Sequence, residues 1–230
     1  MSTMNFTLVT KQGESALQLD YERVFAIGYA GRDMEKTMEH IRELERDLGV
    51  APPKKIPTIF QLGTYDLTQD KDLHFVGNGT CGEVEYVIVV KDGKIYIGCG
   101  SDHTDRFMEK DNVPKSKKVC AKPIAPVLWD YEEMKDHWDS IALNSWQTID
   151  GEEMAYQAGT LADILPVEHI LKELDERVGG IDNCVIFSGT VPTLKGYYYG
   201  TNFRYEMVDD TLGRKISSEY NVIVISEEER

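Results

Sequence analysis

The residues best suited to chemistry are three carboxylates that flank one short turn. Glu83 and Glu85 alternate with apolar residues, and Asp102 follows Glu83 by 19 positions. Between them, Asp92-Gly93 is a dipeptide typical of two-residue hairpin turns. If it forms the turn, residues whose numbers add up to 185 face each other across the hairpin, which pairs Glu83 with Asp102.

This register gives the hairpin two different faces. One face carries only uncharged side chains, namely Val84, Tyr86, Ile88, Val90, Ile95, Ile97 and Cys99. The other carries Glu83, Glu85 and Asp102, beside the small residues Gly98 and Gly100. Directly opposed Cβ atoms are about 5 Å apart, so the three acids would converge. A β-bulge at either glycine would shift this register.

Converging carboxylates repel one another, so they share protons or bind a cation. A hard divalent ion with oxygen ligands is the natural occupant, with Mg²⁺ first, then Mn²⁺ or Ca²⁺. The alternative is a polar strand face in contact with solvent, on which Glu83, Glu85 and Asp102 would have no common function.

The composition limits the remaining classes of protein. The chain has 230 residues and a net charge of −15, which disfavours nucleic acid and anionic membranes as partners. It contains no apolar run long enough for a membrane span, and its first residues do not resemble a secretion signal. The four cysteines are scattered, which indicates free thiols and a cytoplasmic protein.

The surrounding pattern predicts a mainly β protein of the α+β class. We expect a single domain over residues 1–230, with a strand–helix–loop segment at 1–60 packed on it and a frayed tail at 226–230. Asp33 can cap a helix over 33–48 that ends at Gly49, and a second helix is expected over 167–178. Strands are expected at 184–187, 203–208 and 221–225, with loops at 51–57 and 188–192.

Several motifs together resemble the fumarylacetoacetate hydrolase-like superfamily, over roughly residues 22–225. They are Glu83-Val84-Glu85, the hairpin, Asp102-His103-Thr104-Asp105-Arg106, Lys117 with Pro123-Ile124-Ala125-Pro126, and Ser188-Gly189-Thr190-Val191-Pro192. The resemblance implies a β-sandwich roll with mixed or antiparallel sheets and a few short helices, which usually forms a homodimer.

The resemblance also implies a site and a reaction. Glu83, Glu85 and Asp102 would hold Mg²⁺ or Mn²⁺, and Lys117 and Thr190 would hold a small anionic oxo acid. The reaction would cleave a C–C bond next to the ketone of a 2-oxo or β-diketo acid such as an acylpyruvate, by hydrolysis or as a lyase. A divalent ion favours such a reaction because it stabilises the developing enolate.

One departure leaves the general base open. Hydrolases of this type commonly carry Asn-Tyr-x-x-His, but the matching stretch, residues 28–34, has no histidine. His40, Asp33 and His103 are the remaining candidates, and each also has a structural explanation. The alternatives are a decarboxylase or tautomerase of oxaloacetate-like acids, or a protein that binds a metal and a carboxylate without catalysis.

Some further residues have expected roles near this site. Arg32 could bind a substrate carboxylate with both of its terminal nitrogens, and Arg106 is expected to orient Asp102 from behind. Lys122 competes with Lys117 for contact with the substrate, and spacing does not separate them. The residues Tyr197-Tyr198-Tyr199 could line the pocket or form an exposed patch.

Overall fold

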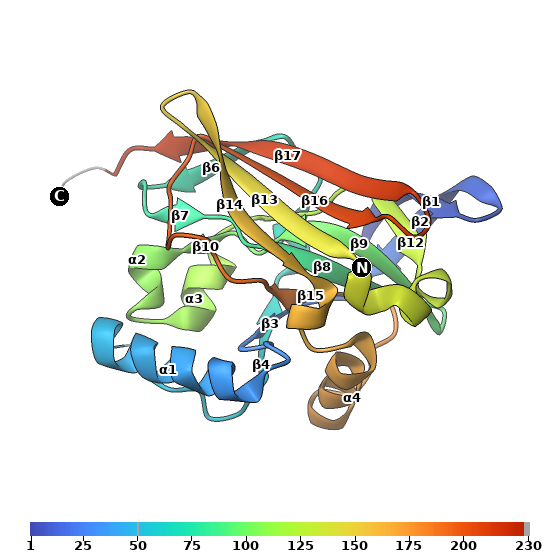
Figure 1. Cartoon of the computed structure of the whole chain (residues 1–230), viewed down its shortest axis with the longest axis horizontal. Helices are drawn as coiled ribbons and strands as arrows, with labels where there is room; N and C mark the ends of the chain where they lie inside the picture. The colour runs from blue at the N-terminus through green and yellow to red at the C-terminus, as the bar shows by residue number, and fades with distance from the viewer. Residues whose placement is uncertain (50, 228–230) are drawn as a thin grey trace.

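Two β-sheets form the body of the protein, with helices along one side (Figure 1). The computed structural model describes residues 1–49 and 51–227, apart from the side chains of His40, Leu44, Asp47 and Leu48. The mainly β architecture predicted from the sequence is confirmed. None of the helices in the described ranges is long and apolar enough to cross a membrane.

The larger sheet contains eight strands within the described residues and is mixed, because β1 pairs with β12, and β3 with β15, in parallel. Its order is β2 (Gly13–Tyr21), β1 (Ser2–Thr10), β12 (Val127–Asp130), β9 (Lys94–Ser101), β8 (Val84–Lys91), β15 (Cys184–Thr190), β3 (Arg23–Gly28) and β4 (Thr58–Leu62). The N-terminal segment therefore supplies β1, β2, β3 and the beginning of β4.

The second sheet contains five strands among the described residues. Its order is β14 (Glu152–Thr160), β13 (Ala142–Ile149), β16 (Asn202–Asp209), β17 (Arg214–Ile225) and β6 (Asp72–Val76). The last two strands pair antiparallel, as predicted, but β17 begins at Arg214 and pairs with β16 through residues 214–221. The segment 221–225, which the sequence predicts as the partner of β16, pairs in parallel with β6 instead. Two short ladders join β7 (Thr80–Cys81) to β10 (Thr104–Asp105), and β5 (Leu67–Thr68) to β11 (Lys122–Pro123).

Short helices connect these strands. The α-helices are α1 (Met34–Leu48), α2 (Arg106–Glu109), α3 (Val113–Lys118) and α4 (Val167–Arg177), and the 3₁₀ helices are η1 (Thr64–Asp66), η2 (Tyr131–Glu133), η3 (Lys135–Ser140) and η4 (Leu161–Asp163). The predicted cap is confirmed, because Asp33 Oδ1 accepts hydrogen bonds from the backbone N–H groups of Glu35 and Lys36 at 3.0 and 3.2 Å.

The hairpin of β8 and β9 has the predicted register. Asp92 and Gly93 both have positive φ, 52° and 72°, as a type I′ turn requires. Ile88 lies opposite Ile97, and Tyr86 lies opposite Cys99. Beyond the last ladder pair, the Asp102 N–H donates to the Glu83 carbonyl at 3.0 Å, so these two residues remain aligned.

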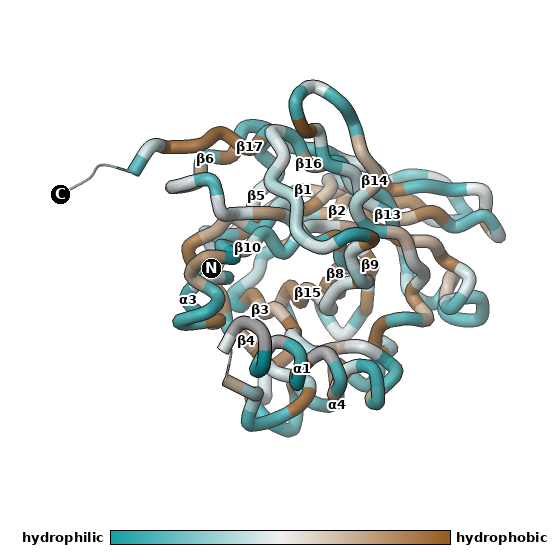
Figure 2. The backbone as a smooth tube through the Cα atoms, turned by 60° about the vertical axis from the view of Figure 1, so that its left-hand side comes forward, coloured by the Kyte–Doolittle hydropathy of each residue, from teal (hydrophilic) through white to brown (hydrophobic). Residues whose placement is uncertain are grey.

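Both faces of this hairpin are buried, so its acidic face is not the solvated surface that the sequence left open. One face, with Tyr86 and Ile97, packs in a core shared with residues of the five-stranded sheet such as Tyr205. On the other face, Val87 and Val89 lie in a second core, enclosed by the curled larger sheet. Figure 2 shows the hydrophobic residues concentrated on these central strands. Glu85 therefore projects from a strand with little access to water.

The loop expected at residues 188–192 is shorter than predicted, because β15 continues to Thr190 with a shift in register after Phe187. Gly189 has a φ of +95°, and a Cβ atom there would lie 2.7 Å from Ala30 Cβ. This irregularity brings Gly189 and Thr190 next to Glu85. Of the predicted tail, residues 226 and 227 lie beyond β17, and 228–230 are outside the described residues.

Candidate active site

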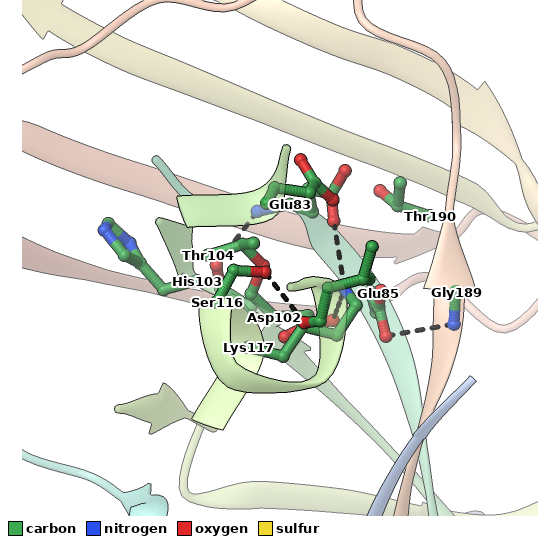
Figure 3. Close-up of polar contacts among 12 residues, drawn as sticks. Glu83, Glu85, Asp102, His103, Thr104, Ser116, Lys117, Gly189 and Thr190 are labelled. Carbon is green, nitrogen blue, oxygen red and sulfur yellow. Dashed lines mark hydrogen bonds and ion pairs between the residues drawn. The ribbon is translucent and has the colours of Figure 1, made fainter. Parts of the chain in front are cut away.

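The three predicted carboxylates converge at one end of the β8–β9 hairpin (Figure 3). One potential ligand atom from each of Glu83, Glu85 and Asp102 lies within 4.8 Å of the others. Asp102 is 0% exposed and Glu85 1%, whereas the Glu83 side chain is 13% exposed. The group is therefore accessible mainly from the side of Glu83.

Two lysines neutralise Asp102 from different elements. Lys117 Nζ, at the end of α3, donates a hydrogen bond to Asp102 Oδ2 and lies 3.8 Å from Glu83 Oε2. Lys122 Nζ, in β11, lies 3.2 Å from Asp102 Oδ1. Burial raises the pKa of Asp102, but the charges of both lysines outweigh it and lower the pKa to about 2. Asp102 is therefore ionised across the physiological range.

The ammonium group of Lys122 already has its donors in use. It donates to the carbonyl oxygens of His103, Lys117 and Cys120, at 2.6, 2.5 and 3.1 Å. Consequently Asp102 Oδ1 is buried beside a positive charge but accepts no hydrogen bond from any described residue. An unpartnered carboxylate oxygen of this kind is suited to coordinate a cation.

Glu85 has the opposite electrostatic environment. Burial raises its pKa well above the usual range, and the negative charges of Asp102 and Glu83 raise it further. Its Oε2 atom accepts one hydrogen bond, from the Gly189 N–H at 3.0 Å. The surroundings therefore favour the protonated form of Glu85 when no cation is bound, and a divalent ion would replace that proton. The donor set of Glu83, Glu85 and Asp102 therefore fits Mg²⁺ or Mn²⁺.

Arg106 holds Glu83, not Asp102 as the sequence predicts. Its Nη2 atom lies 2.9 Å from Glu83 Oε1, and its Nη1 atom lies 3.0 Å from Glu109 Oε2. Its Nε atom donates to Cys81 Sγ at 3.2 Å. Arg106 begins α2 two residues after Thr104, and from there its side chain runs back past Cys81 to Glu83. The guanidinium therefore fixes the most exposed of the three carboxylates.

The expected substrate-binding residues differ in their surroundings. Lys117 lies among the carboxylates, as described above. Thr190 Oγ1 donates to the Val84 carbonyl at 2.6 Å and accepts from Gln157 Nε2 at 2.8 Å, so its proton is in use. Arg32 instead pairs with Asp139 at 2.7 Å.

Arg32 also donates to the carbonyl oxygens of Leu161 and Ile164, at 3.0 and 3.1 Å. These bonds attach it to the segments around η3 and η4. Within residues 1–49 and 51–227, no hydrogen bond or ion pair joins Arg32 to Glu83, Glu85 or Asp102.

Two of the candidate bases, Asp33 and His103, lie outside this group of side chains. Asp33 is exposed and caps α1. The ring of His103 points away from the carboxylates (Figure 3), stacks on Phe75 at 4.0 Å and shares a 2.7 Å hydrogen bond with the Tyr220 hydroxyl. Burial, followed by the charges of Lys122 and Arg106, lowers its pKa. The side chain of His40 lies outside the described residues.

Two further residues border the site without having been predicted there. Glu109 shares Arg106 with Glu83. Tyr29 has a φ of 54°, which is rare for a bulky residue and is often found at functional sites. Burial and then the charge of Glu109 raise the pKa of Tyr29, and Lys117 lowers it, so its hydroxyl lies within electrostatic reach of both. The Gly-Tyr-Ala-Gly turn at 28–31 was the available signal.

Solved structures of similar fold include "2-keto-3-deoxy-D-arabinonate dehydratase apo form", with a TM-score of 0.65 and 17% identity over 90% of this chain and 75% of that one. Another is "2-keto-3-deoxy-D-arabinonate dehydratase complexed with magnesium and 2,5-dioxopentanoate", with a TM-score of 0.61 and 18% identity over 90% of this chain and 75% of that one. A third, "Crystal structures of Cg1458", has a TM-score of 0.63 and 14% identity over 98% and 100%.

These likenesses confirm the fumarylacetoacetate hydrolase-like fold expected from the sequence. No curated protein sequence matches the chain significantly. Residues 27–220 match the profile of a family described as "Protein of unknown function (DUF2848)".

Proposed function

We propose that this chain, which belongs to the DUF2848 family, is a divalent-metal-dependent enzyme that acts on a small 2-oxo or β-diketo acid. One observation carries the proposal: Glu83, Glu85 and Asp102 converge within 4.8 Å, nearly buried, beside the ammonium group of Lys117. Lys117, Lys122 and Arg106 pair with Asp102 and Glu83, but Glu85 forms no ion pair with a described residue, so a bound cation would offset the cost of burying its charge. The dehydratase of similar fold, complexed with magnesium and 2,5-dioxopentanoate, supports the same metal and the same class of ligand.

Glu83, Glu85 and Asp102 would hold the ion, which supplies Lewis-acid polarisation of a bound ketone. Lys117 places a permanent positive charge beside these ligands, because burial lowers its pKa but the charges of Asp102 and Glu83 raise it well above the usual value. That charge favours the negative charge that develops on the oxo acid when a bond next to the ketone breaks. Thr190 offers a lone pair, or its proton if its bond to Val84 opens.

Two candidate reactions are compatible with this site, and they differ in the bond that breaks. The first is cleavage of a C–C bond next to the ketone of an acylpyruvate-like acid, by hydrolysis or as a lyase. The second is decarboxylation or tautomerisation of an oxaloacetate-like acid. Asp33 and His103 lie away from the carboxylates, so neither is placed to activate water for hydrolysis, and the second reaction needs no such base. A protein that binds metal and carboxylate without turnover remains the third outcome of the assay.

The test combines metal binding with turnover. Mg²⁺ or Mn²⁺ should raise the melting temperature of the metal-free protein, and acetylpyruvate or oxaloacetate should be consumed only when the metal is present. Glu83→Gln and Asp102→Asn should abolish both effects, whereas the exposed Glu14→Gln should keep both. If metal binds but no oxo acid is consumed, the enzyme proposal is wrong. If no metal binds, the site itself is wrong.

We further propose a cytoplasmic homodimer. The four cysteines are buried and free, which supports a reducing compartment. Light scattering of the purified chain would give its mass in solution, and a mass of one chain would contradict the dimer.

A further inference from the structure

Three exposed aromatic side chains lie around Arg106, which pairs with Glu83. Phe107, Tyr197 and Tyr199, which we call the aromatic rim, are 57%, 37% and 42% exposed. The rings of Phe107 and Tyr199 contact each other with centroids 5.9 Å apart. Isolated exposed apolar residues are common, but a contiguous group beside a polar site is typical of a binding surface.

Arg106 connects the rim to the carboxylates. Its guanidinium carbon lies 4.4 Å from the centre of the Tyr197 ring, and its Nη2 atom lies 2.9 Å from Glu83 Oε1. Glu83 is the most exposed of the three carboxylates. A small molecule that reaches the carboxylates from this side therefore extends its far end over the rim.

The rim is held in place by its neighbours. Tyr198 contacts Tyr156, with ring centroids 6.0 Å apart, and its carbonyl accepts from Gln147 Nε2 at 2.8 Å. The Gly200 N–H donates to Gln147 Oε1 at 2.7 Å. With the segment anchored at Tyr198, Tyr197 and Tyr199 turn to the outer side.

The ring of Phe107 lies directly over Gly79. A Cβ atom at Gly79 would lie 2.5 Å from its ring, so only glycine permits the observed ring position. Pre-positioned aromatic rings lose little freedom when they bind a ligand, which favours affinity.

The charges near the rim select against an anionic tail. Arg106 is already paired with Glu83 and Glu109, and the neighbouring Asp105 caps α2 through the N–H groups of Phe107 and Met108. A second carboxylate at the far end of a substrate would meet Glu109 and Asp105. A neutral tail would meet only the ring faces.

We infer that the aromatic rim binds a neutral aryl or similarly flat apolar tail, so that the preferred substrate is a monocarboxylic 2-oxo acid with such a tail. This inference rests on the proposed function, since the carboxylates and Lys117 must hold the oxo-acid end. The inference adds to that function the members of the oxo-acid class that bind most tightly and the residues that determine this preference.

The test measures the affinities of three oxo acids for the full chain loaded with Mn²⁺, by calorimetry. Phenylpyruvate should bind about tenfold more tightly than pyruvate, because an aromatic contact corresponds to roughly a 2- to 12-fold change in affinity and the rim offers more than one. 2-Oxoglutarate, whose tail is anionic, should bind no more tightly than pyruvate.

Variants assign the preference to the rim. Tyr199→Ala and Phe107→Ala should each lower the ratio of the affinity for phenylpyruvate to that for pyruvate by about 3-fold. Tyr199→Phe should retain this ratio. Gly79→Ala should lower it too, because the new Cβ displaces the Phe107 ring. Met154→Ala, an exposed apolar residue of β14, is the matched control and should leave the ratio unchanged.

The possible results are separable. Equal affinities for phenylpyruvate and pyruvate, or a preference that survives all of the rim variants, would overturn the inference and leave the proposed function standing. Failure of all three acids to bind the Mn²⁺-loaded chain would overturn both.

Discussion

At the scale of single residues, the candidate site contains two kinds of buried carboxylate. Asp102 is held ionised by Lys117 and Lys122, which lower its pKa. Glu85 has only the Gly189 N–H as a described hydrogen-bond partner, and burial with the neighbouring carboxylates raises its pKa. The fold therefore stores an unfavourable charge at Glu85, which a cation or a proton relieves.

Replacing this charge should stabilise the metal-free protein. Because the folded pKa of Glu85 is raised, the native state keeps a proton that the unfolded state loses, so stability falls as pH rises from the ordinary glutamate pKa through the folded one. Glu85→Gln should add about 1–3 kcal/mol to the free energy of unfolding at pH 8, since one pKa unit corresponds to about 1.4 kcal/mol. Urea denaturation in chelator at pH 8 and pH 5 measures this.

The gain should shrink toward pH 5, and Glu14→Gln, on the exposed part of β2, should show neither the gain nor the pH dependence. A Glu85→Gln protein that is less stable than the parent at pH 8, without metal, would contradict the assigned environment of Glu85.

Lys122 has a structural role that its spacing does not reveal. It is 0% exposed and joins three carbonyl groups to Asp102. Lys122→Met should cost about 3–5 kcal/mol of unfolding free energy, because it removes one of the two cations beside the buried Asp102 and leaves three buried carbonyl groups without their donor. Lys36→Met, at a side chain 84% exposed, should change it by less than about 0.5 kcal/mol. Urea denaturation at pH 7 measures the unfolding free energy of both variants, and an equal loss in the two would be incompatible with this structural role of Lys122.

At the scale of elements, the β8–β9 hairpin determines the geometry of the site. Its type I′ turn sets the register, and a slip of one residue would move Glu85 to the opposite face of the sheet. The apolar pairs along both strands hold the same register, since each face is buried in its own core.

The turn residue itself can be tested. Gly93 has a φ of 72°, so Gly93→Ala should cost about 1–2 kcal/mol, the usual penalty for an L-residue in the left-handed region. Lys94→Ala, at the next and also exposed position, should cost less than about 0.5 kcal/mol. In both variants Mg²⁺ should still raise the melting temperature, because the core pairs preserve the register. If Mg²⁺ no longer raised the melting temperature of Gly93→Ala, the turn and not the core pairs would set the register of the hairpin.

The sequence was sufficient for this hairpin because all the information is local: a turn dipeptide, the alternation of side chains and small residues beside the acids. The same local reasoning identified the helix that Asp33 caps. It was insufficient where partners come from distant segments. Arg106 contacts Glu83 because the main chain after Asp102 turns back at α2, which spacing does not reveal.

The two lysines illustrate the same limit. Lys117 and Lys122 are equivalent by spacing, and both pair with Asp102. Lys117 also reaches Glu83, whereas Lys122 is held by three carbonyl oxygens. Their difference arises from the end of α3 and from the pairing of β11 with β5, a strand more than fifty positions earlier in the chain. The burial of the acidic face also could not be predicted from the sequence, since it depends on the curling of the larger sheet.

At the scale of the whole molecule, buried ion pairs distant from the carboxylates link the two sheets. Asp209, at the end of β16, accepts from Arg214 at 3.1 Å and lies 2.9 Å from His137 Nε2 in η3. Arg214 also pairs with Glu133 at 3.0 Å, and its guanidinium carbon lies 4.4 Å from the ring centre of Trp129 in the larger sheet. The group therefore fastens the five-stranded sheet to β12 and to the short helices beside it.

This link predicts an acid-sensitive contribution to global stability. Burial raises the pKa of Asp209, but hydrogen bonds from His137, the Leu212 N–H and Arg214 outweigh it and lower the pKa. A lowered folded pKa stabilises the protein above the ordinary aspartate pKa, and the stabilisation is lost as pH falls through the folded value. Asp209→Asn should cost about 3–5 kcal/mol at pH 7, because the buried Arg214 then keeps only Glu133 as a charge partner. The difference in unfolding free energy between Asp209→Asn and the parent should narrow below about pH 4.

The control is Asp210→Asn, at the exposed neighbouring position, which should match the parent in urea titrations at both pH 7 and pH 3.5. If the cost of Asp209→Asn were the same at pH 7 and pH 3.5, the carboxylate charge would not be what joins the sheets.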